Sequence, residues 1–368
     1  NDFVKMGGIE IIPESITAES IADALPIVRK EIPATKKSPG VERSSIDQRI
    51  DYRWIDLRTD ENQLMFQGSD RQVNAMRQFL IDHNFIEIHT PKLIGAASES
   101  GAEVFEVKYF DRLAYLAQSP QFYKQMAMAS GFERIFEVGP RFQSREVNTN
   151  KHTTEFSGFD LEFSYITSFK DVMKMEEELL TYMLKSGQGE DGEEIKELFG
   201  KEVIVPTTPF PVIKLADLYD ELEKEFGYTV PDSEKGDLTT DAERLSYDWV
   251  MKKYGHEFLF ITDYQSQRSV RSIICATRTA CRRAMTSSGA ASRLTTGAQR
   301  EHRYDVLKSQ AQEKGLDKDV EFYLEFFKYG CPPHGGFGIG IDRLTMLMLG
   351  LHIKRSNVHL QSPNRLTP

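Results

Sequence analysis

The chain has 368 residues, of which 40% are hydrophobic and 28% charged, and its formal net charge is −10. This composition is typical of a globular protein with one large domain or two ordinary ones. The negative charge argues against an indiscriminate nucleic-acid coat protein, whereas a local basic patch would still allow a nucleic-acid partner. No run of about 18 apolar residues occurs, so we expect no membrane partner. Three cysteines without a Cys-x-x-Cys pair favour a reducing, cytoplasmic location and argue against a zinc site.

The first half of the chain alternates linker-like and periodic segments. Residues 7–16 are strand-like, and residues 29–45 are charged, with two prolines and no periodicity, as in a linker. Ser69 opens a capping-box pattern, SDRQ, ahead of a helix whose apolar positions are Val73, Met76, Phe79 and Leu80. Residues 86–91, IEIHTP, alternate like a strand and end at a proline. The chain is therefore expected to mix helices and strands without regular βαβ units, which indicates an α+β fold with an antiparallel sheet.

A second helix is predicted over residues 168–186, followed by a loop at 187–194. The inward positions of this helix are Phe169, Val172, Met173, Leu179, Leu180 and Met183. The segment GQGEDGEE at 187–194 is rich in glycine and charge, so we interpret it as a solvated loop. Residues 195–258 are interpreted as a mixed, partly helical insertion.

Two strand-like stretches, at 135–139 and 156–166, predict a hairpin with a polar face. Period-two alternation places Phe159, Leu161, Phe163 and Tyr165 on one face of the second strand and Asp160 and Glu162 on the other. This pattern fits a half-exposed antiparallel strand, or a polar floor that binds an amine, a metal or another cation. In the first strand and its extension, Arg141, Gln143 and Arg145 share one face. They fit either a phosphate or carboxylate site or a cross-strand ladder of salt bridges.

Residues 335–351, GGFGIGIDRLTMLMLGL, read as a glycine-rich strand that leads into a short apolar helix. Arg343 lies near the start of this helix, where a cation needs an anionic partner. That partner is either a neighbouring carboxylate such as Asp342 or the phosphate of a ligand. The glycines would let a ligand approach the backbone closely, although the pattern matches neither a P-loop nor a dinucleotide fingerprint.

Taken in order, these pieces resemble the catalytic domain of class II aminoacyl-tRNA synthetases, and within them the aspartyl branch of archaeal and eukaryotic type. Residues 70–91 resemble the motif that forms the homodimer interface in this class, 136–163 the second motif, and 335–350 the third. QSPQFYKQ at 118–125, GAQREHRYD at 297–305, PPHGG at 332–336 and the terminal RLTP resemble the aspartyl branch specifically. The resemblance implies a catalytic domain over 51–368 with the insertion at about 187–258. It also implies a hinge at 14–50 and, at 1–13, the tail of an anticodon-binding OB-fold.

The same resemblance implies a reaction and its site residues. L-Aspartate and ATP would form aspartyl-adenylate with Mg²⁺, and the aspartyl group would pass to tRNA(Asp). Lys124 and Arg300 would bind the substrate's side-chain carboxylate, and the remaining implied aspartate-binding residues are Ser98, Glu99, Gln121 and Asp160. The implied ATP-binding residues are Arg141, Gln143, Arg145, His152, Phe156, Glu162, Gly338 and Arg343. The metal-binding carboxylates of the family would fall near Thr286 and Arg293.

The chain departs from the family in two places. The second motif of the class carries Phe-Arg-x-Glu, where this chain has Phe142, Gln143, Ser144 and Arg145. Residues 265–293 also lack the family pattern and hydrophobic periodicity, and a shift of reading frame would restore the pattern there and, with two compensating slips, at 143–146. Two other functions therefore stay open: a non-catalytic paralogue that binds aspartate, ATP or tRNA, and an ATP-dependent asparagine synthetase on the same fold.

Overall fold

The computed structural model describes residues 8–9, 12–29, 42–95, 104–144, 153–264, 275–283, 292–313, 315–318 and 320–356. The chain forms two compact units, residues 1–56 and 57–368. The first unit contains helices α1 (Ile46–Asp51) and α2 (Arg53–Asp56), and Ser45 closes a capping box on α1. Most of the segment 1–13 lies outside the described residues, so its assignment to an OB-fold stays a prediction.

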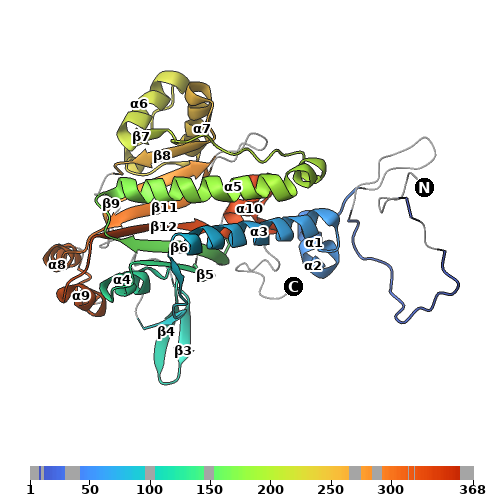
Figure 1. The fold of residues 1–368 in the computed structure, drawn as a ribbon, viewed down its shortest axis with the longest axis horizontal. Helices are drawn as coiled ribbons and strands as arrows, with labels where there is room; N and C mark the ends of the chain where they lie inside the picture. The colour runs from blue at the N-terminus through green and yellow to red at the C-terminus, as the bar shows by residue number, and fades with distance from the viewer. Residues whose placement is uncertain are drawn as a thin grey trace. The chain divides into compact units, whose positions relative to one another are not determined.

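The second unit contains the remaining helices and all the strands that the structure describes (Figure 1). The helices are α3 (Asp60–Asp82), α4 (Gln121–Ala129), α5 (Phe169–Phe199), α6 (Leu215–Phe226), α7 (Thr240–Tyr254), α8 (Tyr304–Glu313), α9 (Glu321–Lys328) and α10 (Ile341–Leu349), with 3-10 turns η1 (Asp232–Glu234) and η2 (Ile353–Arg355). The strands are β1 (Ile86–Glu87), β2 (Leu93–Ile94), β3 (Glu106–Tyr109), β4 (Arg112–Leu116), β5 (Arg134–Phe142), β6 (Glu155–Ser164), β7 (Val212–Lys214), β8 (Phe258–Thr262), β9 (Cys275–Arg283), β10 (Ser292–Arg293), β11 (Thr295–Arg300) and β12 (His334–Gly340).

One large sheet organises this unit. Among the described residues its strand order is β1-β5-β6-β12-β11-β9-β8-β7, with β10 paired to β9. The central pairs are antiparallel, and parallel pairing occurs at the two edges, between β1 and β5 and between β7 and β8. The predicted hairpin is β5–β6, in register from Arg134 opposite Phe163 to Phe142 opposite Glu155. The α+β fold with a largely antiparallel sheet flanked by helices is thus confirmed.

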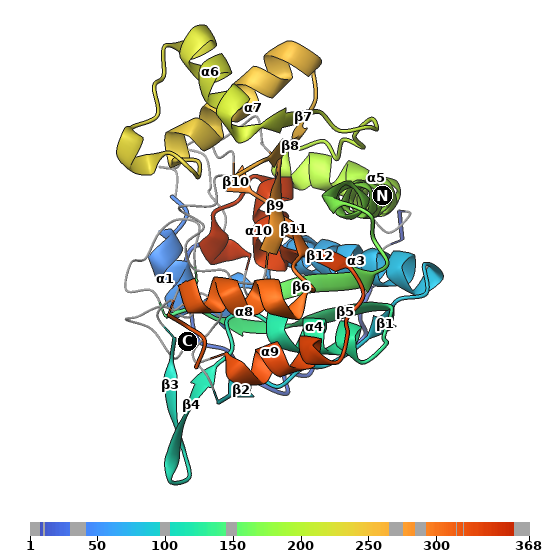
Figure 2. The ribbon, with the colours of Figure 1, turned by 90° about the vertical axis from the view of Figure 1, so that its left-hand side faces the viewer.

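Helices α3, α5 and α10 cover one face of the sheet, as Figures 1 and 2 show. Phe159, Leu161 and Phe163 of β6 and Phe337 of β12 point into this layer and are almost fully buried. Because alternate residues of a strand point to opposite faces, Asp160 and Glu162 point to the other face, beside α4. Tyr165 was expected among the core residues, but it lies beyond β6 with φ 62° and is 68% exposed.

The helix expected to start at Ser69 begins earlier. Helix α3 starts at Asp60, where the Thr59 hydroxyl accepts from the Asn62 amide, so the SDRQ capping-box pattern lies inside the helix and is not its start. The predicted inward residues of α3 (Val73, Met76, Phe79 and Leu80) are all buried. Periodicity therefore predicted the buried face correctly, whereas the local capping signal misplaced the start.

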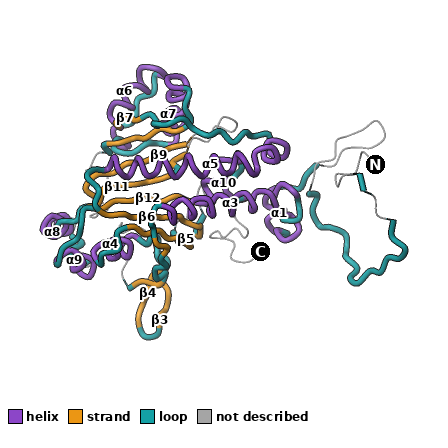
Figure 3. Tube along the Cα trace, in the orientation of Figure 1, coloured by secondary structure: helices purple, strands orange, loops and turns teal. Residues whose placement is uncertain are grey.

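The segment 187–194, predicted as a loop, is helical. Helix α5 runs as one helical segment through it to Phe199 and ends at Gly200, whose φ of 63° is left-handed (Figure 3). The physical reason is tertiary: Asp191 is buried and pairs with Arg71 of α3. A buried carboxylate that loses its cation is strongly destabilising. This pair therefore binds the supposed loop to the neighbouring helix, which local glycine content cannot reveal.

Two smaller groups extend from the sheet. Strands β2, β4 and β3 form a separate three-stranded sheet, whose β3–β4 hairpin projects outward in Figure 2. Helices α6 and α7 pack on β8 with a core of their own that includes Leu218, Trp249 and Leu259. The predicted mixed insertion therefore contains helices with an apolar core.

Gly336 of β12 lies at the centre of the sheet, where the neighbouring strand leaves no space for a side chain. A Cβ atom at this position would overlap the Leu161 carbonyl and lie 2.6 Å from the Glu162 Oε2 atom. Because the first obstacle is backbone, Gly336→Ala should lower the free energy of unfolding by about 3 kcal/mol, measured by denaturant titration.

Gly189 provides the matched control, since it lies in α5 with no atom within 4 Å of its added Cβ. Gly189→Ala should stabilise the protein by about 0.5–1 kcal/mol, because alanine favours a helix interior. Equal effects of the two substitutions would contradict the packing argument.

Candidate functional site

The candidate site lies on the sheet face opposite the apolar core, where four adjacent strands present alternate residues. Antiparallel register brings Arg141 of β5 opposite Phe156 of β6, Gly338 of β12 opposite Asp160, and Gly336 opposite Glu162. Residues that are paired across antiparallel strands point to the same face. The predicted polar floor of Asp160 and Glu162 is therefore continuous with the strands on both of its sides.

Glycines in and beside this strand leave space around Asp160 and Glu162 that larger side chains would fill. A Cβ atom at Gly338 would come within 2.9 Å of the Asp160 carboxylate, and one at Gly158 would overlap the Arg141 side chain. The glycines thus leave room for charged side chains to lie flat on the sheet. This arrangement explains why the glycine-rich strand is placed beside the acidic one.

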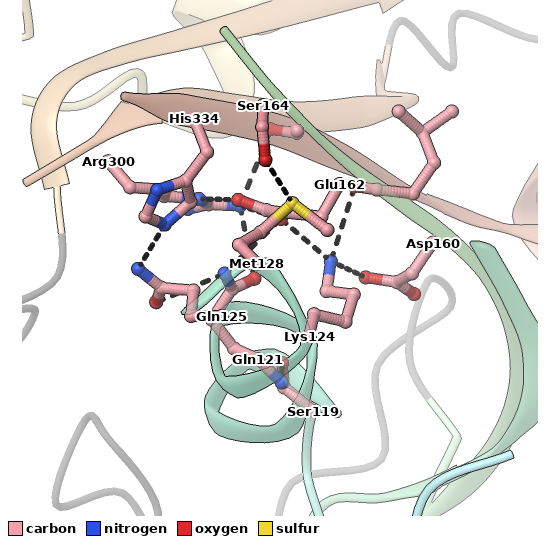
Figure 4. Close-up of polar contacts among 12 residues, drawn as sticks. Ser119, Gln121, Lys124, Gln125, Met128, Asp160, Glu162, Ser164, Arg300 and His334 are labelled. Carbon is pink, nitrogen blue, oxygen red and sulfur yellow. Dashed lines mark hydrogen bonds and ion pairs between the residues drawn. The ribbon is translucent and has the colours of Figure 1, made fainter. Parts of the chain in front are cut away.

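Helix α4 brings a lysine down onto the two carboxylates. The Lys124 Nζ atom lies 3.0 Å from Asp160 Oδ1 and 3.3 Å from Glu162 Oε2, and its side chain is fully buried (Figure 4). Asp160 and Glu162 are only 3% and 0% exposed. The half-exposed-strand interpretation is therefore wrong: α4 covers the polar face, and both carboxylates pair with Lys124.

Arg300, at the end of β11, completes the cluster from the other side. Its Nε atom donates to Glu162 Oε1 at 2.8 Å, and its Nη2 atom donates to Gln121 Oε1 at 3.0 Å. Gln121 in turn donates to Glu162 Oε2 at 3.3 Å. Four residues implied by the resemblance, namely Gln121, Lys124, Asp160 and Arg300, are thus brought together with Glu162, which had been assigned to ATP.

The charges of this cluster shift the pKa values of its members. Burial alone would raise the pKa of Glu162, but Arg300 and Lys124 outweigh it and hold that pKa at about 2. Burial lowers the pKa of Lys124 to about 8, against the opposing attraction of Glu162. Glu162 is therefore a permanent anion, whereas the charge of Lys124 can be lost at mildly alkaline pH.

A neutral network that the sequence did not reveal supports the cluster from behind. Gln125 donates to His334 Nε2 at 2.9 Å and accepts from the Tyr323 hydroxyl at 3.1 Å. His334 donates through Nδ1 to the Pro332 carbonyl at 2.8 Å, so it is neutral, and burial lowers its pKa further. The available signals were the i, i+4 spacing of Gln121 and Gln125 and the histidine of the PPHGG segment.

Arg141 was expected to bind ATP, and the structure places it against Asp160, which the resemblance had assigned to aspartate binding. Its guanidinium forms an ion pair with Asp160, and its side chain is 14% exposed. Phe156 lies opposite Arg141 and is half-buried. The backbone N–H of Gln143 donates to the backbone carbonyl of Thr154 at 2.8 Å. The salt-bridge alternative for this strand therefore describes Arg141 correctly, with Asp160 as the partner, whereas Arg145 lies outside the described residues.

Arg343 and Asp342 occupy the start of α10. The Arg343 Nη1 atom donates to the Arg293 carbonyl at 3.0 Å, and Asp342 accepts from the Ser157 amide at 3.1 Å. Burial raises the pKa of Asp342 to about 6. Arg343 thus lies next to β10, and its predicted contact with a ligand phosphate stays a prediction.

Several predicted residues lie outside the described part of the chain: Ser98, Glu99, Arg145, His152 and Thr286. Their roles therefore stay predictions, as does the frame-shift hypothesis for 265–293 and 143–146, of which residues 145–146, 265–274 and 284–291 lie outside the described residues. Arg293 is described, and it forms an ion pair with Asp237. Among the described residues, no three His, Cys, Asp or Glu side chains gather closely enough to hold a metal ion.

Comparison with known proteins places this geometry in a family. A model of the class II tRNA synthetases (D, K and N) matches residues 45–357. An aspartate–tRNA(Asp/Asn) ligase from Methanopyrus kandleri is 40% identical over 98% of the chain and 80% of its own length. An aspartate–tRNA(Asp) ligase from Pyrococcus horikoshii is 37% identical over the same shares of the two chains.

Solved structures show the same fold. An asparaginyl-tRNA synthetase from Pyrococcus horikoshii, complexed with asparaginyl-adenylate, aligns with a TM-score of 0.77 and 30% identity over 88% of this chain and 74% of its own. A putative aspartyl-tRNA synthetase from Leishmania major Friedlin aligns with a TM-score of 0.76 and 31% identity over 89% of this chain and 70% of its own.

In the part of the chain that the structure describes, each helix is too short or too polar to cross a membrane.

The acidic floor with its buried cations, the order of the motifs along the chain and both kinds of comparison agree. The chain belongs to the class II tRNA synthetases of the aspartate, lysine and asparagine group, a family of ligases.

Proposed function

We propose that this protein is an aspartate–tRNA ligase, which forms aspartyl-adenylate from L-aspartate and ATP and then aminoacylates tRNA(Asp). The observation that carries the proposal is the convergence of two cationic side chains, Lys124 and Arg300, at one buried acidic floor. The relatives named as aspartate–tRNA ligases support the same substrate.

The choice of aspartate over asparagine rests on hydrogen-bond chemistry. Lysine and arginine carry only donors, so they complement the two acceptor oxygens of a carboxylate. The amide group of asparagine would instead turn its own NH₂ donors toward at least one of these cations. In a buried site such a mismatch is costly, because neither group can turn to water. Lys124 and Arg300 are therefore proposed to bind the side-chain carboxylate of the substrate, and Asp160 its ammonium group.

The adenylation step needs little acid–base chemistry from the protein. The substrate's α-carboxylate attacks the α-phosphate of ATP and displaces pyrophosphate, so the protein must position the two groups and stabilise the charge that develops. We propose that Phe156 stacks on the adenine, that Gly338 lets the nucleotide approach the sheet, and that Arg343 binds the outer phosphates. Phe156 and Gly338 share the sheet face of Asp160, which supports this placement.

Mg²⁺ is the usual companion of ATP in this class, but among the described residues no three His, Cys, Asp or Glu side chains gather to hold it. The position near Arg293, where the resemblance implied a carboxylate, holds a cation paired with Asp237. We therefore assign no step to a metal ion. A binding-only paralogue and an asparagine synthetase remain outcomes of the experiments below.

The remaining partners follow from the family. We propose a cytoplasmic homodimer whose two subunits contact each other through residues 70–91. Within this segment Ile81 and Ile86 are 53% and 52% exposed. Two exposed isoleucines on adjoining elements are consistent with a surface that a partner covers.

Amino-acid selectivity should be visible in ATP–pyrophosphate exchange. We expect kcat/KM for L-aspartate to exceed that for L-asparagine by at least about 100-fold, because the site offers donors to both side-chain oxygens. Equal rates with asparagine would reject the proposed substrate. Exchange with neither amino acid would favour the binding-only paralogue, and ammonia-dependent formation of asparagine would favour the synthetase.

Arg300→Gln should reduce kcat/KM for aspartate about 100- to 1,000-fold, because it removes a buried cation from the carboxylate site. Arg112→Gln is the matched control: its side chain is 78% exposed on the β3–β4 hairpin, and we expect exchange to change less than twofold. Exchange kinetics of both variants at varied aspartate concentration provide the measurement. A similar loss in both variants would contradict a specific role for Arg300.

Alkaline pH should weaken aspartate use. The pKa of Lys124 is about 8 in the protein without substrate, so Lys124 becomes neutral as the pH rises through that value. Since the neutral amine no longer attracts a carboxylate, kcat/KM for aspartate should fall toward a tenfold decrease per pH unit between pH 8 and 9. A flat profile of kcat/KM from pH 7 to 9 would show that the charge of Lys124 is not required.

A further inference from the structure

Asp160 is held by two cations that arrive from different directions. Lys124 reaches Asp160 Oδ1 from α4 at 3.0 Å, while the Arg141 guanidinium contacts Asp160 Oδ2 from the neighbouring strand. Asp160 is 3% exposed, so these charges interact in a medium that screens them much less than water does. The affinity of Asp160 for a positively charged ligand therefore depends on both Lys124 and Arg141.

A substrate ammonium group at Asp160 would be a third cation around one buried carboxylate. In a poorly screened environment, three positive charges around one negative charge repel one another strongly. Lys124 also contacts Glu162 and is fixed on α4. Arg141 is therefore the cation that can move away from Asp160. The ammonium group and the Arg141 guanidinium are thus competitors for Asp160.

The structure offers the displaced guanidinium a place to go. Gly139 and Gly158 face each other across β5 and β6, and the Arg141 side chain lies over Gly158. A small pocket next to it is lined by both glycines, Arg141 and Glu137. Glu137 on the same face of β5 is buried and already pairs with Lys92, which lines the same pocket, so the displaced guanidinium would turn toward Phe156, which lies opposite Arg141 in the strand register.

We propose that Arg141 is a substrate-displaced counter-ion: it occupies the ammonium subsite at Asp160 in the free protein and must leave before an α-amino acid binds. This inference rests on the proposed function for the role of Asp160. Arg141 thereby determines affinity for ligands that carry an α-ammonium group and not for their desamino analogues. Displacement also returns the guanidinium to the side of Phe156, where the sequence predicted a contact with ATP.

The competition has a measurable size. If the guanidinium occupies Asp160 about 90% of the time, the apparent Kd of the amino acid is raised about tenfold. Arg141→Met removes the charge and keeps an unbranched side chain, and Lys124 still pairs with Asp160 in this variant. We therefore expect Arg141→Met to bind L-aspartate about tenfold more tightly than the unmodified protein, in calorimetric titrations without ATP.

Succinate, which is aspartate without its ammonium group, separates competition from direct binding. It cannot replace the guanidinium at Asp160, so Arg141→Met should leave its Kd unchanged or raise it. Arg141→Lys, which keeps a cation, should bind aspartate within about twofold of the unmodified protein. Arg134→Met, on the same strand with its guanidinium bonded to the His83 carbonyl, is the control and should change neither Kd.

Weaker or unchanged aspartate binding in Arg141→Met would overturn the proposal, as would equal tightening of succinate. Arg141→Gln repeats the test with a polar neutral side chain if the methionine variant does not fold. L-Asparagine and succinamate, titrated in parallel, keep the result independent of the substrate assignment. If only asparagine binds, the proposed aspartate specificity fails, while its tightening in Arg141→Met would still support the displaced counter-ion.

Discussion

The buried ionic cluster around Glu162 is the interaction on which the rest of the site depends. Glu162 lies between Arg300 from β11 and Lys124 from α4, with Gln121 as a further donor. A buried carboxylate tolerates the loss of its partners poorly, so the strand, the helix and the sheet neighbour must all be in place together. The cluster therefore couples the assembly of the sheet to the formation of the site.

The backbone of the sheet makes this cluster possible. Gly336 and Gly338 lie directly beside Glu162 and Asp160, where larger side chains would collide with the carboxylates. On the opposite face, Phe159, Leu161 and Phe337 anchor the same strands to helices α3, α5 and α10. One set of strands thus combines an apolar face that supplies stability with a polar face that carries charge. The close packing of the glycines against Asp160 and Glu162 connects the stabilising apolar face with the charged polar face.

Membership in the class II synthetases gives this geometry a chemical context without deciding every residue. The solved relatives include an asparaginyl enzyme as well as an aspartyl one, so the shared fold alone does not determine the amino acid. The resemblance implied an arginine at the position of Gln143 and a metal-binding carboxylate near Arg293. Near these two departures, Arg141 pairs with Asp160 and Arg293 with Asp237, so the cations at both places have defined partners in the structure.

By itself, the sequence determined the features that depend on local periodicity. The β5–β6 hairpin, the shared face of Asp160 and Glu162, and the inward residues Val73, Met76, Phe79 and Leu80 of α3 and Val172, Met173, Leu179, Leu180 and Met183 of α5 follow from repeats of 2 or 3.6 residues. The strand–helix unit at 335–351 followed from its glycines and its apolar run. The family motifs additionally indicated Gln121, Lys124 and Arg300, although these positions are far apart in the sequence. Only the tertiary structure showed that α4 covers the acidic strand face, that Asp191 keeps α5 helical through 187–194, and that Arg141 binds Asp160. Each of these features depends on a charge neutralised by a residue from another element, and such long-range pairing leaves no periodic signal in the chain.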